Sequence, residues 1–313
     1  MKYGYFDDAA REYVITDPAT PMPWINYLGN SEYLGLISNT AGGYSFYLDA
    51  RLRRLTRYRY NNVPMDVGGR YLYLRNNQTG EFWSPTWQPT RTQLDRYKCQ
   101  HGMGYTIITS EYKGVEASVR YFIPLDESLE IWTATITNNS DGELDLSAFS
   151  FIEFCLWDAA DDSTNFQRNL NIGQVEVEDG VIYHKTEYRE RRDHFAYFAC
   201  SEEIAGYDTQ RKEFIGLYNG FETPQVVVKG ESNNSFAHGW SPIGSHHVKI
   251  RLAPGASKQI IFILGYQENP KDQKFDPPGS QTINKAGAKS ALEKFLNSEN
   301  VETAFKELKN YWT

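Results

Sequence analysis

Four carboxylates lie close together in the sequence and are the first residues to consider for acid–base chemistry. Asp158, Asp161 and Asp162 open the polar stretch DAADDSTNFQRNLN, and Glu153 precedes them on a segment expected to be a strand. Neighbouring like charges can raise the pKa of one carboxyl into the range of a general acid, and sugar chemistry needs a proton donor beside the glycosidic oxygen. A solvated acidic loop is the commoner structure for such a stretch, and we expect it here.

The histidines predict no metal centre. His246 and His247 are adjacent, and neighbouring side chains on a strand point to opposite faces, so the pair is a poor chelate. We expect both to lie on the surface or in a turn. His101 stands in the motif HGMGYT, where a structural hydrogen bond is the expected role and a sugar contact is the alternative. The sequence carries no serine-nucleophile motif, phosphate-cradling glycine loop or zinc signature, and we expect no cofactor.

Arginines and aromatic residues gather between residues 42 and 106. A guanidinium offers a fixed fork of donors and an aromatic face covers the C–H face of a sugar, so together they can hold polar, ring-shaped ligands. The alternative, which we favour for most of them, is a sheet whose own faces these residues cover. The residues are Arg51, Arg53, Arg54, Arg57, Arg59, Tyr71, Tyr73, Trp83, Trp87, Tyr97 and Tyr105.

Composition narrows the class of protein. The 313 residues carry a net charge of −8, so a phosphate backbone is an unfavourable partner and we expect no nucleic acid. Three widely spaced cysteines fit neither a disulfide framework nor a zinc pattern and indicate reduced thiols. The first residues show no signal-peptide pattern, and no apolar run approaches transmembrane length. We therefore expect a cytoplasmic protein with no membrane partner.

The period of the apolar residues divides the chain into three parts. Through residue 268 they alternate in short runs between turn sequences such as NNSDG, which is typical of antiparallel strands and hairpins. Residues 225–229 are among the expected strands. Residues 269–287 carry three prolines and are expected to form a linker. Residues 288–313 repeat apolar residues at helical spacing, with Asn300 as the expected N-cap of a second helix.

The end of the second helix is informative. Its apolar stripe continues to Tyr311 and Trp312, without glycine, proline or a basic last turn. A helix with an unused apolar face usually packs on another element, and we expect that element to belong to a helical domain absent from a shortened chain. Docking of the helix back on the β domain is the alternative.

Several long motifs resemble the N-terminal domain of the cellobiose phosphorylases, inverting disaccharide phosphorylases of glycoside hydrolase family 94. The motifs are MKYGYFDDAAREYVITDPATPMPWINYLGN, GGYSFYLDARLRRLTRYRYNN, HGMGYT and ADDSTNFQRNLN. The resemblance implies a mainly β fold: a large antiparallel β-sandwich of the supersandwich, galactose-mutarotase-like type over residues 1–268, followed by linker helices that lead to a catalytic (α/α) barrel. It also implies a homodimer and the phosphorolysis of cellobiose, with inorganic phosphate as co-substrate, to α-glucose 1-phosphate and glucose.

The resemblance places the catalytic acid in the barrel, so we expect no catalytic residue in this chain and no activity from it alone. It implies substrate binding by Gln167 and Arg168, because the family's N-terminal domain lends such a loop to the acceptor-side glucose, and both side chains can bond sugar hydroxyls. A functionless loop is the alternative. For the whole chain, the alternatives are a related phosphorylase acting on cellodextrin, chitobiose or laminaribiose, a stand-alone carbohydrate-binding module, and a mutarotase-like enzyme.

Overall fold

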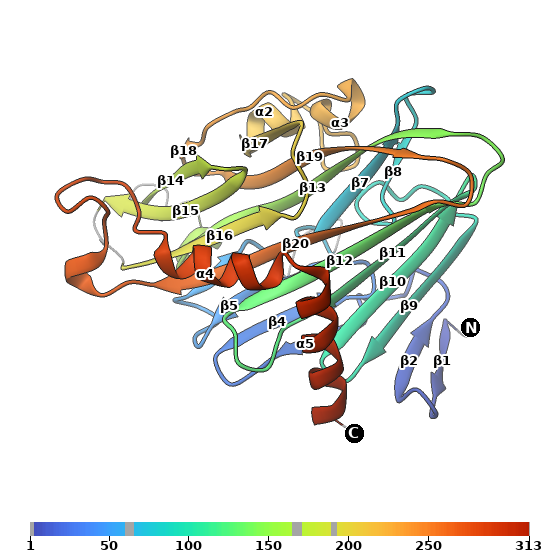
Figure 1. The fold of residues 1–313 in the computed structure, drawn as a ribbon, viewed down its shortest axis with the longest axis horizontal. Coiled ribbons are helices and arrows are strands. Elements are labelled where there is room, and N and C mark those ends of the chain that lie inside the picture. The colour runs from blue at the N-terminus through green and yellow to red at the C-terminus, as the bar shows by residue number, and fades with distance from the viewer. Residues whose placement is uncertain (1–2, 60–65, 165–170, 189–192, 313) are drawn as a thin grey trace.

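Two large antiparallel sheets packed face to face make up most of the chain (Figure 1). The computed structural model describes residues 3–59, 66–164, 171–188 and 193–312, and Gln167 and Arg168 lie outside these ranges. The expected mainly β, antiparallel sandwich is confirmed. Within the described ranges the sheets have eleven and nine strands.

The strands of each sheet follow one another in space in an order that differs from the chain order. The larger sheet runs β1 (Gly4–Asp7), β2 (Glu12–Ile15), β9 (Arg96–Gly102), β10 (Tyr105–Tyr112), β11 (Val115–Phe122), β12 (Leu129–Asn138), β20 (Ser257–Glu268), β16 (His194–Cys200), β15 (Val181–Tyr188), β14 (Asn171–Glu178) and β18 (His238–Gly239). The smaller sheet runs β17 (Gly206–Gln210), β19 (Pro242–Leu252), β13 (Leu144–Trp157), β6 (Arg54–Thr56), β5 (Gly43–Tyr47), β4 (Tyr33–Ser38) and β3 (Ile25–Gly29), while β7 (Tyr71–Asn76) pairs with β13 and with β8 (Phe82–Trp83).

The core between the sheets follows from strand alternation. In β11, the residues Val115, Ala117, Val119 and Tyr121 are buried in this core, while the residues between them are polar and only partly buried. Because successive side chains of a strand point to opposite faces, a period of two in the sequence places one face of β11 against the smaller sheet.

A pair of short helices covers the outer face of the smaller sheet. The helices α2 (Arg211–Ile215) and α3 (Gln225–Lys229) pack their apolar residues on aromatic side chains of β7 and β13. The expectation of a strand at residues 225–229 is therefore wrong. Pro224 precedes the helix and Gly230 ends it in the left-handed region. A short apolar run suits a strand or a helix equally well, and here the residues at its two ends favour the helix.

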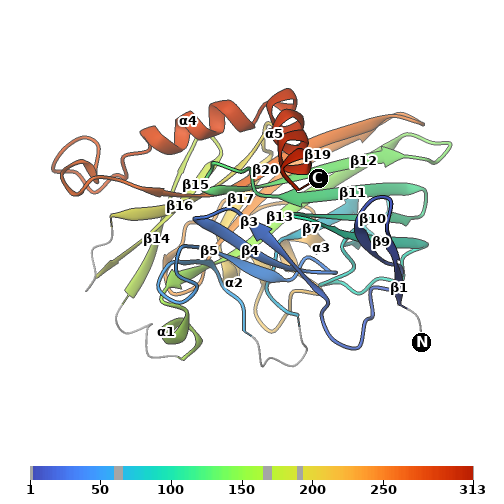
Figure 2. The same ribbon diagram turned by 90° about the horizontal axis from the view of Figure 1, so that it is seen from below.

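The C-terminal helices cover the outer face of the larger sheet (Figure 2). After the 3-10 helix η2 (Lys271–Gln273), the chain forms α4 (Ala286–Phe295) and α5 (Ser298–Tyr311). Both helices were expected, but the N-cap of α5 is Asn297, whose Oδ1 accepts the N–H groups of Glu299 and Asn300 at 2.9 and 3.3 Å. The cap therefore lies three residues before the expected Asn300.

The apolar stripe of α5 is in use. Phe305 meets Tyr105 of β10 and Phe122 of β11, each with 5.2 Å between ring centroids. Arg120 of β11 places its guanidinium carbon 4.1 Å from the centre of the Phe305 ring and pairs with Glu302. The expectation of an unused apolar face is wrong, because Val301, Phe305 and Leu308 pack on apolar side chains of the larger sheet's outer face.

Candidate functional site

The acidic stretch begins as a short helix instead of a loop. Asp158 is the N-cap of α1 (Ala159–Ser163), and its Oδ1 accepts the N–H groups of Ala160 and Asp161 at 3.0 and 3.1 Å. Aspartate suits this position because its carboxylate satisfies N–H groups that the helix leaves unpaired.

Three of the four carboxylates are also buried. Asp158 and Glu153 are each 8% exposed and Asp162 is 5% exposed, whereas Asp161 is half-buried. The expectation of a solvated acidic loop is therefore wrong.

One guanidinium holds the buried carboxylates together. Arg57 donates from Nε and Nη2 to the two carboxylate oxygens of Asp162, both at 2.6 Å, and from Nη1 to Oε1 of Glu153 at 2.5 Å. Its Nη2 also donates to the carbonyl of Trp240 at 3.0 Å. Burial lowers the pKa of Arg57, but the charge of Glu153 and the hydrogen bonds and charge of Asp162 outweigh it and raise the pKa above its ordinary value.

This geometry decides what the carboxylates can do. Arg57 occupies both oxygens of Asp162 and Oε1 of Glu153 with short hydrogen bonds that it donates, so these carboxylates serve as acceptors within the fold. Arg57 thereby fastens α1 to β6 and β13, and it fixes the position from which the chain enters residues 165–170. The sequence-predicted pair Gln167 and Arg168 belongs to that segment and lies outside the described residues.

Two more arginines of the cluster, Arg53 and Arg54, serve the fold. Arg54 lies over the ring of Tyr44, with its guanidinium carbon 3.8 Å from the ring centre. Arg53 donates to the Tyr266 hydroxyl at 3.0 Å and to Glu268 at 2.6 Å. These contacts agree with the favoured interpretation, in which the sheet's own residues cover its faces.

A small polar pocket beside Arg57 contains one arginine that the sequence did not point to, Arg211. Its volume is about 140 Å³, and Arg59, Arg211 and Glu153 line it with Arg57. Arg211 comes from α2 and lies over the ring of Phe221, 5.0 Å from its centre. No local motif links α2 to the arginines near residue 57, because the two segments meet only through the order of the strands.

The histidines are structural, but they are not on the surface. In β19, His246 and His247 are 0% and 2% exposed, so the expectation of surface or turn histidines is wrong. Nε2 of His246 lies 2.9 Å from the carbonyl of Gly180, and Nε2 of His247 lies 2.9 Å from the Ser147 hydroxyl. Burial lowers the pKa of each to about 4.

His101 takes the structural role expected of it. Its Nδ1 lies 2.9 Å from the Thr106 hydroxyl and its Nε2 lies 3.1 Å from the carbonyl of Trp24. Burial lowers its pKa to about 4, so the ring is neutral near pH 7.

In the described part of the chain, no group of three or more histidine, cysteine, aspartate or glutamate side chains is arranged to hold a metal ion. Among the same residues, no helix has the length and apolar character needed to cross a membrane.

Comparison with known proteins places this fold. Two long antiparallel sheets with helices over both outer faces form a β-supersandwich, and residues 11–298 match the family described as "Glycosyl hydrolase 94, supersandwich domain". The chain belongs to this family.

Its relatives include phosphorylases. The chain is 36% identical to an N,N'-diacetylchitobiose phosphorylase of Vibrio proteolyticus over 315 residues, which cover 100% of this chain and 37% of that protein. It is 33% identical to a solabiose phosphorylase of Paenibacillus borealis, over 81% of this chain and 33% of the relative. The chain thus spans little more than a third of the length of these relatives.

A solved structure shares the fold. A human-microbiome protein described provisionally as a kojibiose phosphorylase superimposes with a TM-score of 0.54 at 10% identity, over 100% of this chain and 39% of the other. At that identity the likeness concerns the fold alone.

Proposed function

We propose that this chain is the N-terminal supersandwich domain of a disaccharide phosphorylase. The enzyme would split a disaccharide with inorganic phosphate into a sugar 1-phosphate and a free sugar, with inversion at the anomeric carbon. The observation that carries the proposal is the end-to-end alignment, at 36% identity, with a curated N,N'-diacetylchitobiose phosphorylase. N,N'-diacetylchitobiose is therefore the first candidate substrate. Cellobiose is the second, and the long N-terminal motifs favour it.

The proposal assigns the chemistry to a part of the enzyme outside this chain. The reaction needs an acid to protonate the leaving oxygen, whereas phosphate is already anionic and needs no protein base. We do not assign that acid to the carboxylates grouped around residue 158, because Glu153 and Asp162 accept hydrogen bonds from Arg57 and Asp158 caps a helix. We expect the acid in a catalytic barrel after residues 288–313, with residues 1–268 as the β domain and residues 269–287 as the linker.

Within the β domain, we propose that Gln167 and Arg168 contact the acceptor-side sugar. Support comes from α1, which stands directly before them and is fixed to the sheet by buried ion pairs at Asp162. A loop that starts from a rigid point loses less conformational freedom when it closes on a substrate. We also infer a homodimer, which light scattering of the full-length enzyme would test.

A domain exchange tests the main proposal. This chain replaces the corresponding 37% of the Vibrio proteolyticus chitobiose phosphorylase, and sugar 1-phosphate is measured with phosphate and either N,N'-diacetylchitobiose or cellobiose. We expect the exchanged enzyme to be active, and neither this chain nor the remaining part of the relative to be active alone. Product formed by this chain alone would refute the assignment of the acid. A folded but inactive exchanged enzyme would refute the domain assignment.

The same enzyme tests the two loop residues. Arg168→Ala should raise KM for the disaccharide about tenfold or more, since it removes a charged hydrogen bond to substrate. Arg51→Ala is the matched control, because the Arg51 side chain is 67% exposed and its one ion pair with the described residues is a 3.6 Å contact with Asp158. Equal KM values for the two variants would leave the loop without a role in binding.

A further inference from the structure

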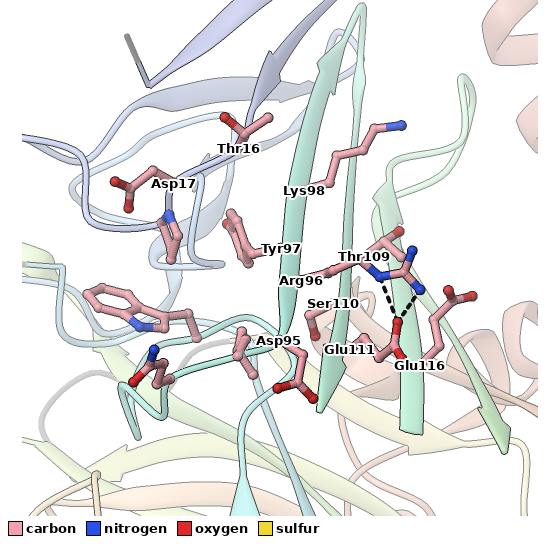
Figure 3. Close-up of a pocket in the computed structure, with 14 residues that line it drawn as sticks. Thr16, Asp17, Asp95, Arg96, Tyr97, Lys98, Thr109, Ser110, Glu111 and Glu116 are labelled. Carbon is pink, nitrogen blue, oxygen red and sulfur yellow. Dashed lines mark hydrogen bonds and ion pairs between the residues drawn. The ribbon is translucent and has the colours of Figure 1, made fainter. Parts of the chain in front are cut away.

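Two adjoining pockets share the side chains of Pro18 and Trp87, and we call them together the Trp87 cleft. The larger has a volume of about 700 Å³ and the smaller about 240 Å³. The larger opens where the edge of the big sheet is incomplete, because the pairing of β2 with β9 stops at Ile15 and Cys99. Figure 3 shows the pocket between β9 and the segment that carries Thr16 and Asp17.

A tightly bonded loop presents Trp87 to both pockets. The backbone of Trp87 has φ +69°, which is unusual for a residue with a large side chain. Its N–H donates to the carbonyl of Ser84 at 3.1 Å, and its carbonyl accepts the N–H of Arg91 at 2.8 Å. The Thr86 hydroxyl donates to the carbonyl of Gln88 at 3.0 Å. Such backbone strain persists where the surroundings enforce it, and it gathers at ligand sites.

The smaller pocket contains a buried carboxylate. Asp66 is 6% exposed and accepts hydrogen bonds from the hydroxyls of Ser38 and Thr40. The Tyr58 hydroxyl donates to its other oxygen, Oδ1, in a long hydrogen bond of 3.4 Å. No ion pair reaches Asp66 from the residues that the structure describes. Its surroundings are therefore suited to hydroxyl donors.

The charge of the larger pocket limits the ligand further. Arg96 already pairs with Glu111, as the dashed lines of Figure 3 show. Acidic side chains outnumber basic ones around this pocket, so an anionic ligand would be repelled. The charged lining residues are Asp17, Asp95, Glu111, Glu116, Arg96 and Lys98.

We propose that the Trp87 cleft is a binding site for a neutral saccharide, with one pyranose ring against the indole of Trp87 and hydroxyls donated to carboxylates such as Asp66. A saccharide has an apolar C–H face, which can lie against an aromatic ring, and a rim of hydroxyl donors, which can bond to carboxylates. The cleft offers a partner for each of these surfaces. The volume of the larger pocket, about 700 Å³, is that of an ordinary small-molecule site. The site does not depend on the proposed phosphorolysis, because every residue that forms it belongs to the described part of this chain.

Calorimetric titration of the 313-residue chain tests the site, with cellotetraose, N,N'-diacetylchitobiose and glucose 1-phosphate as separate probes. We expect at least one neutral saccharide to bind, and glucose 1-phosphate to bind more weakly. Trp87→Gly removes the ring at a position where glycine adopts the backbone angle without strain, and should weaken binding about tenfold or more. Trp240→Ala is the control, because Trp240 is an exposed tryptophan, at 52%, that lies outside the cleft.

A second measurement covers the case in which Trp87→Gly does not fold. The indole N–H resonance of Trp87, assigned by its absence from Trp87→Phe, should shift when the saccharide is added, while that of Trp240 should not. The proposal is overturned if no neutral saccharide binds, if glucose 1-phosphate binds more tightly, if the folded Trp87→Gly variant binds like the parent, or if the Trp87 resonance does not move. A failure of the phosphorolysis assay would leave these outcomes unchanged.

Discussion

The ion-pair cluster around Arg57 makes the sharpest prediction about stability. Arg57→Met keeps the length of the side chain but leaves the carboxylate of Asp162, which is 5% exposed, without its cation, and leaves Glu153 with the longer ion pair to Arg211 at 3.4 Å. Removing one member of a buried ion pair costs about 3–5 kcal/mol, because the remaining charge is left uncompensated. In a domain of this size about 1 kcal/mol corresponds to roughly 2 °C, so the melting temperature should fall by about 6–10 °C.

Calorimetry or circular dichroism on heating would measure this loss of stability. Two further variants serve as its controls. Arg96→Met removes an arginine that also pairs with a glutamate but whose side chain is 74% exposed, so the melting temperature should stay close to that of the parent. Neutralising the whole cluster with Arg57→Met, Glu153→Gln and Asp162→Asn should recover most of the loss, because no charge is then buried alone. Equal melting temperatures for Arg57→Met and Arg96→Met would refute the reasoning.

Three other expectations follow from packing, titration and backbone geometry. Phe305→Ala should destabilise the chain by about 3 kcal/mol and speed the proteolysis of α5, whereas Tyr311→Ala, at a residue 66% exposed, should change little. Burial lowers the pKa of His246 to about 4, so the unfolded chain binds this proton more readily; stability should fall as pH drops from about 6.5 toward 4, by roughly 2 kcal/mol at pH 5. His246→Gln should flatten that part of the curve of urea midpoint against pH, and an unchanged slope would contradict the assignment. At Gly43, with φ +117°, an added Cβ would lie 2.0 Å from a backbone carbonyl of the neighbouring strand, so Gly43→Ala should cost more than about 2 kcal/mol in denaturant unfolding, while Gly142→Ala, with no atom within 4 Å of the added Cβ, should cost less than about 0.5 kcal/mol.

The strands and the C-terminal helices could be predicted because their signals are local. In β11 the apolar residues alternate with polar ones, and the structure buries one face as that pattern requires. The apolar residues of α4 and α5 recur at helical spacing, and both helices form. The prediction of a strand at residues 225–229 failed for a local reason as well. A run of three valines fits a strand or a helix, and only Pro224 and Gly230 mark a helix.

The acidic cluster could not be predicted because its partner is distant in sequence. Arg57 and Asp162 are separated by 105 positions, and nothing in the stretch around residue 158 signals which arginine will reach it. The sequence showed five arginines near residue 57 and several acids near residue 158. Only the pairing of β6 with β13 brings one of the arginines to the acids, and this pairing turns an apparently solvated loop into a buried helix cap.

The buried histidine pair shows how a correct rule can still lead to a wrong expectation. Alternation does send His246 and His247 to opposite faces of β19, since His246 contacts Phe198 between the sheets while His247 stacks on Phe149 toward the outer helices. The prediction of an exposed pair failed because β19 is covered on both sides, which depends on α2 and α3 folding over the smaller sheet. The same geometry makes this pair unable to chelate a metal, because two imidazoles on opposite faces of a strand cannot share one ion.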